Sequence, residues 1–324
     1  MRGSLSVIRV KNFKAVADSG QLKIGPLSVF IGNNGTGKSS VVEALQTLQR
    51  LVLSDIDEAM RPFKGLEHVR HKRSAVAQGR QASGDAPTAF HAMEFILRGR
   101  LEPGSGKNVS RIRFRSETHI NEETSGNRYL IPVDDVRVES GTVVQPKRLL
   151  PPKEPGVAGR LKEKIGPFIR GWQFLSLDPT YMGEPVPTRR GSEPLLLHTS
   201  GSNLADYIQH MVSDHGDEGV RALQGIREAL EFVLPYAASM DPQLSAEIQR
   251  QSWLVMTERS ATKLRRPFTV PGWMLSTGTM RVLALLAVFR HPDPPPLICI
   301  EEIENGLDPR TLRLVVNEIQ SLVE

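Results

Sequence analysis

The feature that most constrains this chain is the run Gly32-Asn33-Asn34-Gly35-Thr36-Gly37-Lys38-Ser39, which fits the phosphate-loop pattern G-x-x-x-x-G-K-[ST]. Glycines let backbone N–H groups turn inward around phosphates, because no side chain stands in the way. An apolar stretch, Leu27–Ile31, comes before the run, and apolar residues recur at helical spacing from Val41 to Leu51. The predicted order of strand, glycine loop and helix is the structural context that the pattern requires.

Each position of this loop has a role in holding a nucleotide. In the pattern, Lys38 reaches the β- and γ-phosphates and assists their transfer, and the Ser39 hydroxyl binds Mg²⁺. The helix that begins near Lys38 directs its positive end at the same anion. We therefore predict ATP and Mg²⁺ as cofactors, with the nucleotide held by Gly32, Asn33, Asn34, Gly35, Thr36, Gly37, Lys38, Ser39 and Ser40.

A second motif lies near the other end of the chain, where four apolar residues end in two acids, Leu297-Ile298-Cys299-Ile300-Glu301-Glu302. A buried strand that ends in acids is the form expected of a Walker B motif. Glu301, at a position where Asp is usual, would hold Mg²⁺, and Glu302 would polarise the attacking water. The alternative is an ordinary strand followed by a solvated acidic turn.

Composition excludes several classes of protein. The single cysteine, Cys299, rules out an intrachain disulfide and a cysteine-based zinc site, and we expect it to be part of the core. No window holds 18 apolar residues, and no signal peptide opens the chain, so we predict a cytoplasmic protein without a membrane span. The formal net charge of +5 permits nucleic-acid binding without requiring it.

Between the two motifs the pattern changes several times. Basic residues gather between residues 55 and 90, and Gln78–Pro87 has the composition of a mobile loop. We predict a small antiparallel sheet from strand-like runs at 90–101, 109–115, 129–138 and 142–147. Helices are expected over 200–250, 275–289 and 310–323, with strands at 253–256 and 297–300.

Three further segments carry a resemblance. Leu275-Ser276-Thr277-Gly278-Thr279-Met280-Arg281 resembles the LSGGQ-type signature of ABC ATPases, in the LSxGxxR variant of the SMC and RecF branch. Glu304-Asn305-Gly306-Leu307-Asp308-Pro309 resembles the D-loop region of that branch, and Val10-Lys11-Asn12-Phe13-Lys14 resembles its opening strand. The chain thus resembles an ABC-type ATPase head of the SMC, RecF and OLD branch over both of its ends.

The resemblance implies a mechanism in which two heads meet and sandwich two ATP molecules. Ser276 and Gly278 would then contact the γ-phosphate bound by the opposite head, and Asp308 would communicate across the dimer. Lys14 would lie near the nucleotide. Simpler roles remain for three of these residues: Ser276 as a helix cap, Asp308 as the N-cap before Pro309, and Lys14 as a solvated lysine.

The implied fold is α/β, a P-loop NTPase of ABC/SMC-head type, whose mixed sheet carries an inserted antiparallel β subdomain and a helical subdomain. We expect a split ATPase core from 1–55 and 270–324, a basic loop and β insertion at 56–175, and a helical insertion with a return strand at 176–269. The resemblance also implies a Q-loop glutamine, which the sequence does not place, because Gln78 and Gln81 lie in a weakly patterned loop without a supporting strand. The switch histidine has no counterpart, since His291 precedes the acidic strand, so we expect a C-terminally truncated head.

The expected function is an ATP-driven switch that dimerises on ATP, in DNA repair or anti-phage defence, with a nuclease partner or a further C-terminal domain. The alternatives are an ATP-dependent scaffold with little hydrolysis and an ABC transporter subunit. DNA would contact the basic insert, and we expect the acids Asp134, Asp135 and Glu139 to lie on a solvated face. The candidate DNA contacts are Arg70, Lys72, Arg73, Arg98, Arg100, Arg111, Arg113 and Arg115.

Overall fold

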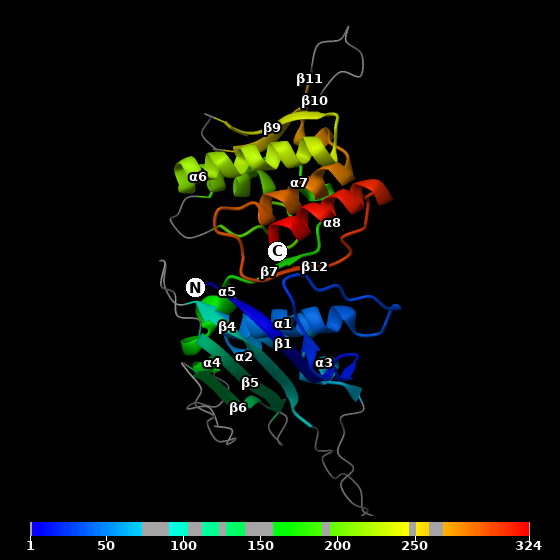
Figure 1. Ribbon diagram of the computed structural model, residues 1–324. Coiled ribbons are helices and arrows are strands. Elements are labelled where there is room, and N and C mark those ends of the chain that lie inside the picture. Colours follow the sequence, from blue (N-terminus) through cyan, green and yellow to red (C-terminus); the bar gives the residue numbers. More distant parts are fainter. Residues whose placement is uncertain are drawn as a thin grey trace, which may run out of the picture. The chain divides into compact units, whose positions relative to one another are not determined.

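The computed structural model describes residues 2–72, 91–102, 112–122, 128–139, 158–189, 195–245, 251–258 and 268–323. The chain divides into two units, Met1–Trp172 (unit 1) and Gln173–Glu324 (unit 2) (Figure 1). Several predicted features lie outside the described residues, namely the loop Gln78–Pro87, the strand at 142–147, Arg73 and Arg111.

Unit 1 is built on one antiparallel sheet whose strands run in the order β2-β1-β4-β5-β6, with β3 paired to β1. The antiparallel strands predicted for the middle of the chain therefore continue the sheet that the N-terminal strand begins. The strands are β1 (Arg2–Phe13), β2 (Val16–Asp18), β3 (Leu22–Lys23), β4 (Met93–Glu102), β5 (Ile112–Glu122) and β6 (Tyr129–Glu139).

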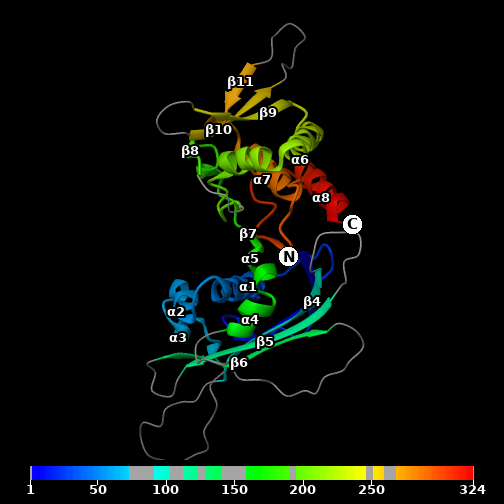
Figure 2. The same cartoon turned by 90° about the vertical axis from the view of Figure 1, so that its left-hand side faces the viewer.

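Helices cover one face of this sheet, as Figure 2 shows for α1, α4 and α5. Side chains alternate along the strands, so β4 buries Met93, Phe95 and Leu97 on the helical side while Glu94 and Arg98 point the other way. Phe168 packs edge-to-face on Trp172 within this core. The helical segments are α1 (Lys38–Leu53), α2 (Ile56–Met60), η1 (Arg61–Phe63), α3 (Leu66–Val69), α4 (Gly159–Lys164) and α5 (Gly166–Arg170).

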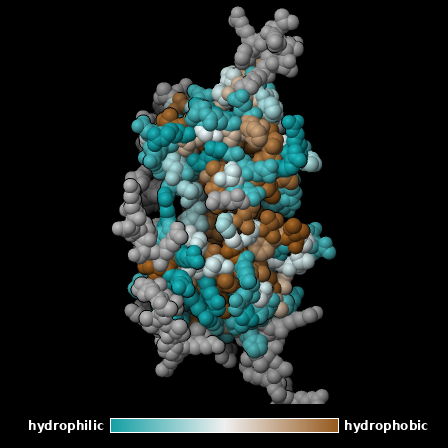
Figure 3. Space-filling view, in the orientation of Figure 1, coloured by the Kyte–Doolittle hydropathy of each residue, from teal (hydrophilic) through white to brown (hydrophobic). Residues whose placement is uncertain are grey.

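The strand predicted over Leu27–Ile31, which its apolar side chains led us to expect in the core, is wrong. These residues form no strand, and Val29 and Ile31 are 72% and 92% exposed. The apolar composition of the segment signals burial, but the segment pairs with no described strand of unit 1. Apolar side chains are visible among the polar ones on the face of the molecule in Figure 3.

The prediction that Asp134 and Asp135 are solvated is also wrong. Asp134 lies on the helical side of β6, fully buried, and its carboxylate accepts hydrogen bonds from the backbone N–H groups of Arg160 and Leu161 at the start of α4. Burial raises the pKa of Asp134, while these two hydrogen bonds act in the opposite direction. Asp135, on the other face, is 6% exposed and pairs with Arg137.

The described residues of unit 2 combine three α-helices with two small sheets. The helices are α6 (Leu204–Val233), α7 (Thr277–Phe289) and α8 (Pro309–Val323), and short 3-10 helices are η3 (Pro179–Tyr181) and η4 (Gly272–Met274). Gly216 breaks α6 with φ 51° and ψ −125°. The expected helix up to residue 250 is wrong beyond α6, because Ala237–Leu244 forms a strand of an antiparallel sheet. The strands are β8 (Val186–Pro187), β9 (Ala237–Leu244), β10 (Gln251–Glu258) and β11 (Phe268–Pro271).

The second sheet of unit 2 has two parallel strands, β7 (Gln173–Leu175) and β12 (Ile298–Ile300). β12 confirms the predicted strand before the acids, and burial raises the pKa of its Cys299 to about 12. The pairing with β7 was not predicted, because a run of three residues carries too little pattern.

The most apolar helix, α7, is packed inside unit 2, where Val282, Leu283 and Ala284 are fully buried against α6 and α8. Its apolar residues point in all directions, which is typical of a central core helix. Among the described residues, no helix has both the length and the apolar character needed to cross a membrane.

Candidate functional site

The phosphate loop of unit 1 is an exposed turn that folds on itself. Gly35 and Gly37 have φ of 82° and 94°, in the left-handed region that favours glycine. A Cβ on Gly37 would also come within 3.1 Å of Val16 Cγ2. The Lys38 Nζ donates hydrogen bonds to the carbonyls of Gly32 and Asn33, at 2.6 and 2.9 Å, so the lysine lies over its own loop.

Helix α1 begins directly after this loop, and its N-terminus has no side-chain cap. The residue at the cap position is Gly37, which has no side chain to offer, while the first intrahelical bond joins Val41 N–H to the Gly37 carbonyl. The first N–H groups of the helix thus face the glycine loop, where an anion binds readily. Ser39 is exposed in this first turn, and Ser40 is buried on the other side of the helix. A triphosphate and its metal ion therefore fit the loop.

Lys14 lies in the turn between β1 and β2, with its neighbour Ala15 beside Gly37. Its ammonium forms an ion pair with Glu43 of α1 at 2.5 Å and lies over the Phe63 ring at 5.1 Å. The Lys14 backbone has φ 47°, which is unusual for a residue with a side chain. Lys14 is therefore held close to the start of α1, but its charge is engaged by Glu43.

In unit 2, the predicted signature opens helix α7. The Ser276 hydroxyl accepts a hydrogen bond from the Thr279 backbone N–H at 3.2 Å, so its role as a helix cap is confirmed. Its Oγ also lies 2.7 Å from the Thr279 hydroxyl, which in turn lies 2.7 Å from the Tyr236 hydroxyl. This chain of three hydroxyl groups fixes the orientation of Ser276, and sequence reasoning missed both Thr279 and Tyr236.

Arg281, one turn further along α7, ties the signature to the acidic strand end. It is 8% exposed and donates to the carbonyls of Leu177 and Glu302, at 2.6 and 3.2 Å. Glu302 has φ 51°, a strained backbone conformation for this residue. Strain of this kind is common at functional positions, and here the carbonyl that Arg281 holds belongs to the strained residue.

The turn that follows the two acids packs against the start of the signature helix. A Cβ on Gly278 would lie 3.0 Å from the Gly306 carbonyl oxygen, so the two backbones are in close contact. Asp308 accepts hydrogen bonds from the N–H groups of Arg310 and Thr311, which confirms it as the N-cap of α8. Hydrogen bonds with Thr311 lower the pKa of Asp308. In unit 2, Arg281 thus connects the signature helix to the backbone of Glu302, and the turn at Gly306 lies against both Gly278 and Arg281.

The predicted site residues fall into two sets, one in each unit. Unit 1 holds the phosphate loop and Lys14, and unit 2 holds the signature, the acids and Asp308. Glu302 is exposed at the end of β12, whereas Glu301 is half-buried with its N–H bonded to the Leu175 carbonyl of β7.

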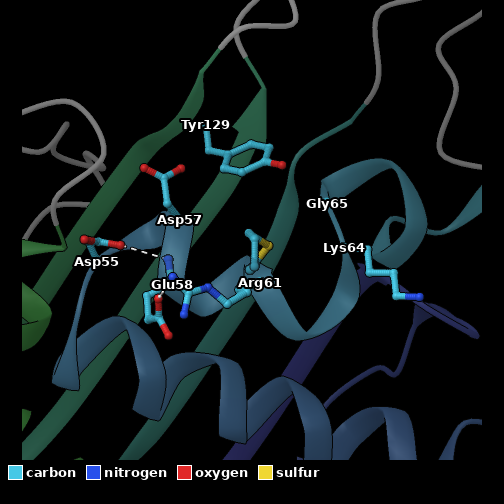
Figure 4. A pocket seen from close by; sticks show the side chains of 8 residues that line it. Asp55, Asp57, Glu58, Arg61, Lys64, Gly65 and Tyr129 are labelled. Atoms are coloured by element: carbon cyan, nitrogen blue, oxygen red, sulfur yellow. Dashed lines mark hydrogen bonds and ion pairs between the residues drawn. The ribbon is translucent and has the colours of Figure 1, made fainter.

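A separate surface cavity lies in unit 1 (Figure 4). It is lined by Asp55, Asp57, Glu58, Met60, Arg61, Lys64, Gly65 and Tyr129. Asp55 caps α2 through the Glu58 backbone N–H, and Glu58 pairs with Arg61. These charged groups are engaged in local structure, and none of the predicted site residues lines the cavity.

Comparison with known families matches both ends of the chain. Residues 4–68 match the family described as "AAA ATPase domain", and residues 224–323 match the one described as "AAA domain, putative AbiEii toxin, Type IV TA system". Each match covers less than half of the chain. No curated protein matches the sequence. The matches support an AAA-type P-loop ATPase and confirm the expected P-loop NTPase fold, while the branch within these ATPases stays a prediction.

Proposed function

We propose that this chain, whose two ends match AAA-type ATPase domains, is a Mg²⁺-dependent ATPase head that dimerises on ATP and acts as a switch. The observation that carries the proposal is the grouping in unit 2, where the buried Arg281 joins the signature helix to the backbone of Glu302. Through this contact, a movement of the signature helix would shift the backbone of Glu302, the acid proposed to polarise the attacking water. Repair of DNA or defence against phage is the setting that we propose, and the toxin–antitoxin description of the C-terminal match supports defence.

In this proposal, different residues bind the phosphates, hold Mg²⁺ and accept the proton of the attacking water. Backbone N–H groups of the glycine loop and the Lys38 ammonium would hold the phosphates of ATP. We propose Ser39 of unit 1 and Glu301 of unit 2 each as a Mg²⁺ ligand. When bound, Mg²⁺ neutralises negative charge on the phosphates. Glu302 accepts a proton from the attacking water, and Ser276 and Gly278 present a helix N-terminus to a second nucleotide. Lys14 lies beside α1 in unit 1, and Asp308 caps α8 in unit 2.

The test is Glu302→Gln, which keeps the size of the side chain and removes its basicity. We expect unchanged ATP binding, phosphate release slowed about 100-fold, and a dimer that accumulates with ATP. Steady-state phosphate release and light scattering after size-exclusion chromatography measure these properties. Glu304→Gln, an exposed neighbour on the same loop, serves as the matched control.

Two results would contradict the proposal. Normal turnover in the Glu302→Gln variant would show that Glu302 does not accept a proton from the attacking water. A wild-type chain that binds ATP and dimerises without releasing phosphate would favour the alternative, an ATP-dependent scaffold.

A second observation favours DNA as a partner. One face of the unit 1 sheet is covered by no described helix, and we call it the helix-free face. On it, Arg98, Arg115 and Arg137 stand opposite one another on β4, β5 and β6, and Arg100 stands opposite Arg113. Like charges directly opposite in a sheet are destabilising, so such rows suggest a polyanionic partner. Arg100 and Arg113 are exposed, and Glu139 of β6 stands opposite Arg113, whereas Arg115 and Arg137 are paired with Glu117 and Asp135.

Not all of the predicted DNA contacts fit this face. Arg70 is 6% exposed and lies near Asn121 and Glu122, so it cannot contact DNA as predicted. For the sheet face, the Arg100→Ala and Arg113→Ala double variant should bind labelled duplex DNA more weakly and with a shallower salt dependence. Arg313→Ala, an exposed arginine of α8, is the control. No binding by the wild-type chain at low salt would exclude this partner.

A further inference from the structure

The helix-free face of the unit 1 sheet carries a cluster of donor groups apart from the ATPase residues. Glu94 on β4 stands directly opposite His119 on β5, and Glu117 lies two residues before His119 on the same face. One oxygen of each carboxylate and one nitrogen of His119 all lie within 4.8 Å of one another. Both strands are interior to the sheet, so the three ligand positions are fixed by hydrogen-bonded backbone on both sides.

Each carboxylate of the cluster already has a basic partner of its own. Lys11 Nζ lies 2.6 Å from Glu94 Oε2, and Arg115 lies 3.1 Å from Glu117 Oε2. The other oxygen of Glu117, Oε1, faces His119 Nε2 at 3.1 Å. Lys11 and Arg115 thus orient the carboxylates from outside, as outer groups do around metal ligands, while His119 and Glu117 Oε1 converge.

We propose that Glu94, Glu117 and His119 bind one divalent transition-metal ion, and that Zn²⁺ is the ion that suits them best. Imidazole and carboxylate together favour zinc over magnesium or calcium, which prefer oxygen ligands alone. With bonds of about 2.0–2.1 Å, two donors 3.1 Å apart subtend an angle of about 98° at the metal, between octahedral and tetrahedral values.

Burial and charge also bear on the strength of the site. The side chains of Glu94, Glu117 and His119 are 23%, 10% and 15% exposed, so a bound ion would be partly shielded and would keep a position open to water. Lys11 and Arg115 reduce the local negative charge and so weaken the attraction for a cation. We therefore expect binding in the micromolar range rather than the tighter binding of structural zinc sites.

The experiment is a calorimetric titration of ZnCl₂ into the full chain, free of nucleotide, chelator and affinity tag. We expect one equivalent to bind, and a melting temperature that rises with zinc concentration because the ion binds the folded state. Co²⁺ in place of Zn²⁺ should give the visible absorption of a coordinated ion. Titration of the Glu301→Gln variant should give the same stoichiometry, which separates this site from the proposed Mg²⁺ site.

Variants locate the binding. His119→Ala and Glu94→Gln should each lower zinc affinity about 10-fold or more, with circular dichroism to verify folding. His68→Ala is the matched control, because His68 lies 3.4 Å from Glu67 in an exposed pair with a single carboxylate. If His119→Ala does not fold, the zinc affinity of Glu94→Gln, a substitution at a half-buried position, tests the proposal instead. Absence of zinc binding by the wild-type chain, or unchanged affinity in the folded variants, would overturn the proposal.

Discussion

The phosphate-loop region of unit 1 and the signature region of unit 2 are held in place by different means. The phosphate loop is exposed, and among the described residues its lysine bonds to the backbone of its own loop alone. The apolar segment Leu27–Ile31 before it pairs with no described strand of unit 1. The signature helix is buried and cross-linked through Arg281. The comparison indicates that the signature region is organised by its own unit, whereas the loop lacks such support within unit 1.

The largest expected effect concerns the phosphate loop. Lys38→Ala removes the charge that would contact the β- and γ-phosphates, and we expect ATP affinity to fall about 100-fold, in line with about 3 kcal/mol for a charged hydrogen-bond partner. Titration with a fluorescent ATP analogue measures the change. The melting temperature should stay nearly constant, because the hydrogen bonds of Lys38 to described residues stay within its own exposed loop.

Lys23→Ala, an exposed lysine of β3, should bind ATP like the wild-type chain. Unchanged affinity in Lys38→Ala would contradict the assignment of the loop. A large loss of stability in that variant would contradict the contrast between the two regions.

The next effect concerns the signature region. Arg281→Ala leaves the carbonyls of Leu177 and Glu302 without their donor, and we expect a loss of about 2–3 kcal/mol in the free energy of unfolding. Hydrogen exchange followed by mass spectrometry should show faster exchange around residues 175–182 and 300–306. Arg313→Ala should leave the free energy of unfolding and the exchange rates unchanged. If the Arg281→Ala chain is as stable as the wild-type chain, the hydrogen bonds of Arg281 do not stabilise this region.

The smallest effect concerns the stability of unit 1 toward acid, through an ion pair between β1 and β2. Arg9 holds the pKa of Asp18 at about 2, below its ordinary value of 3.8. The stabilisation from a lowered carboxylate pKa is complete above the unfolded value and is lost as the pH falls from about 4 to about 2. Asp18→Asn should therefore show a flatter dependence of stability on pH in this window, measured by urea unfolding. Equal slopes for both chains would show that the exposed pair contributes nothing.

The sequence predicted most elements whose pattern is long or strongly marked. Helices α1, α7 and α8 and strands β1, β4, β5, β6, β10 and β12 were expected close to where they occur. Ser276 and Asp308 were anticipated as caps because capping depends on neighbouring backbone. The same local reasoning failed at Leu27–Ile31 and at Asp134, where the outcome depends on a distant partner.

The sequence predicted those functional residues that act together with their neighbours along the chain. A glycine loop followed by Lys38 and Ser39 binds phosphate because of its own backbone and the helix that follows it. The contacts of Arg281 and the chain from Tyr236 to Ser276 join segments that are far apart in sequence. No spacing rule connects such segments, so sequence reasoning could not find them.

By itself, the sequence determined where the phosphate loop, the acids and the signature lie, because each motif is a short run whose residues act on their immediate neighbours. Only the tertiary structure decided that Glu302 is held in a left-handed conformation beside Arg281. The tertiary structure alone also brought Glu94 opposite His119 and Arg98 opposite Arg115. Such pairs depend on strand register, which is set by hydrogen bonds between segments that are distant in sequence.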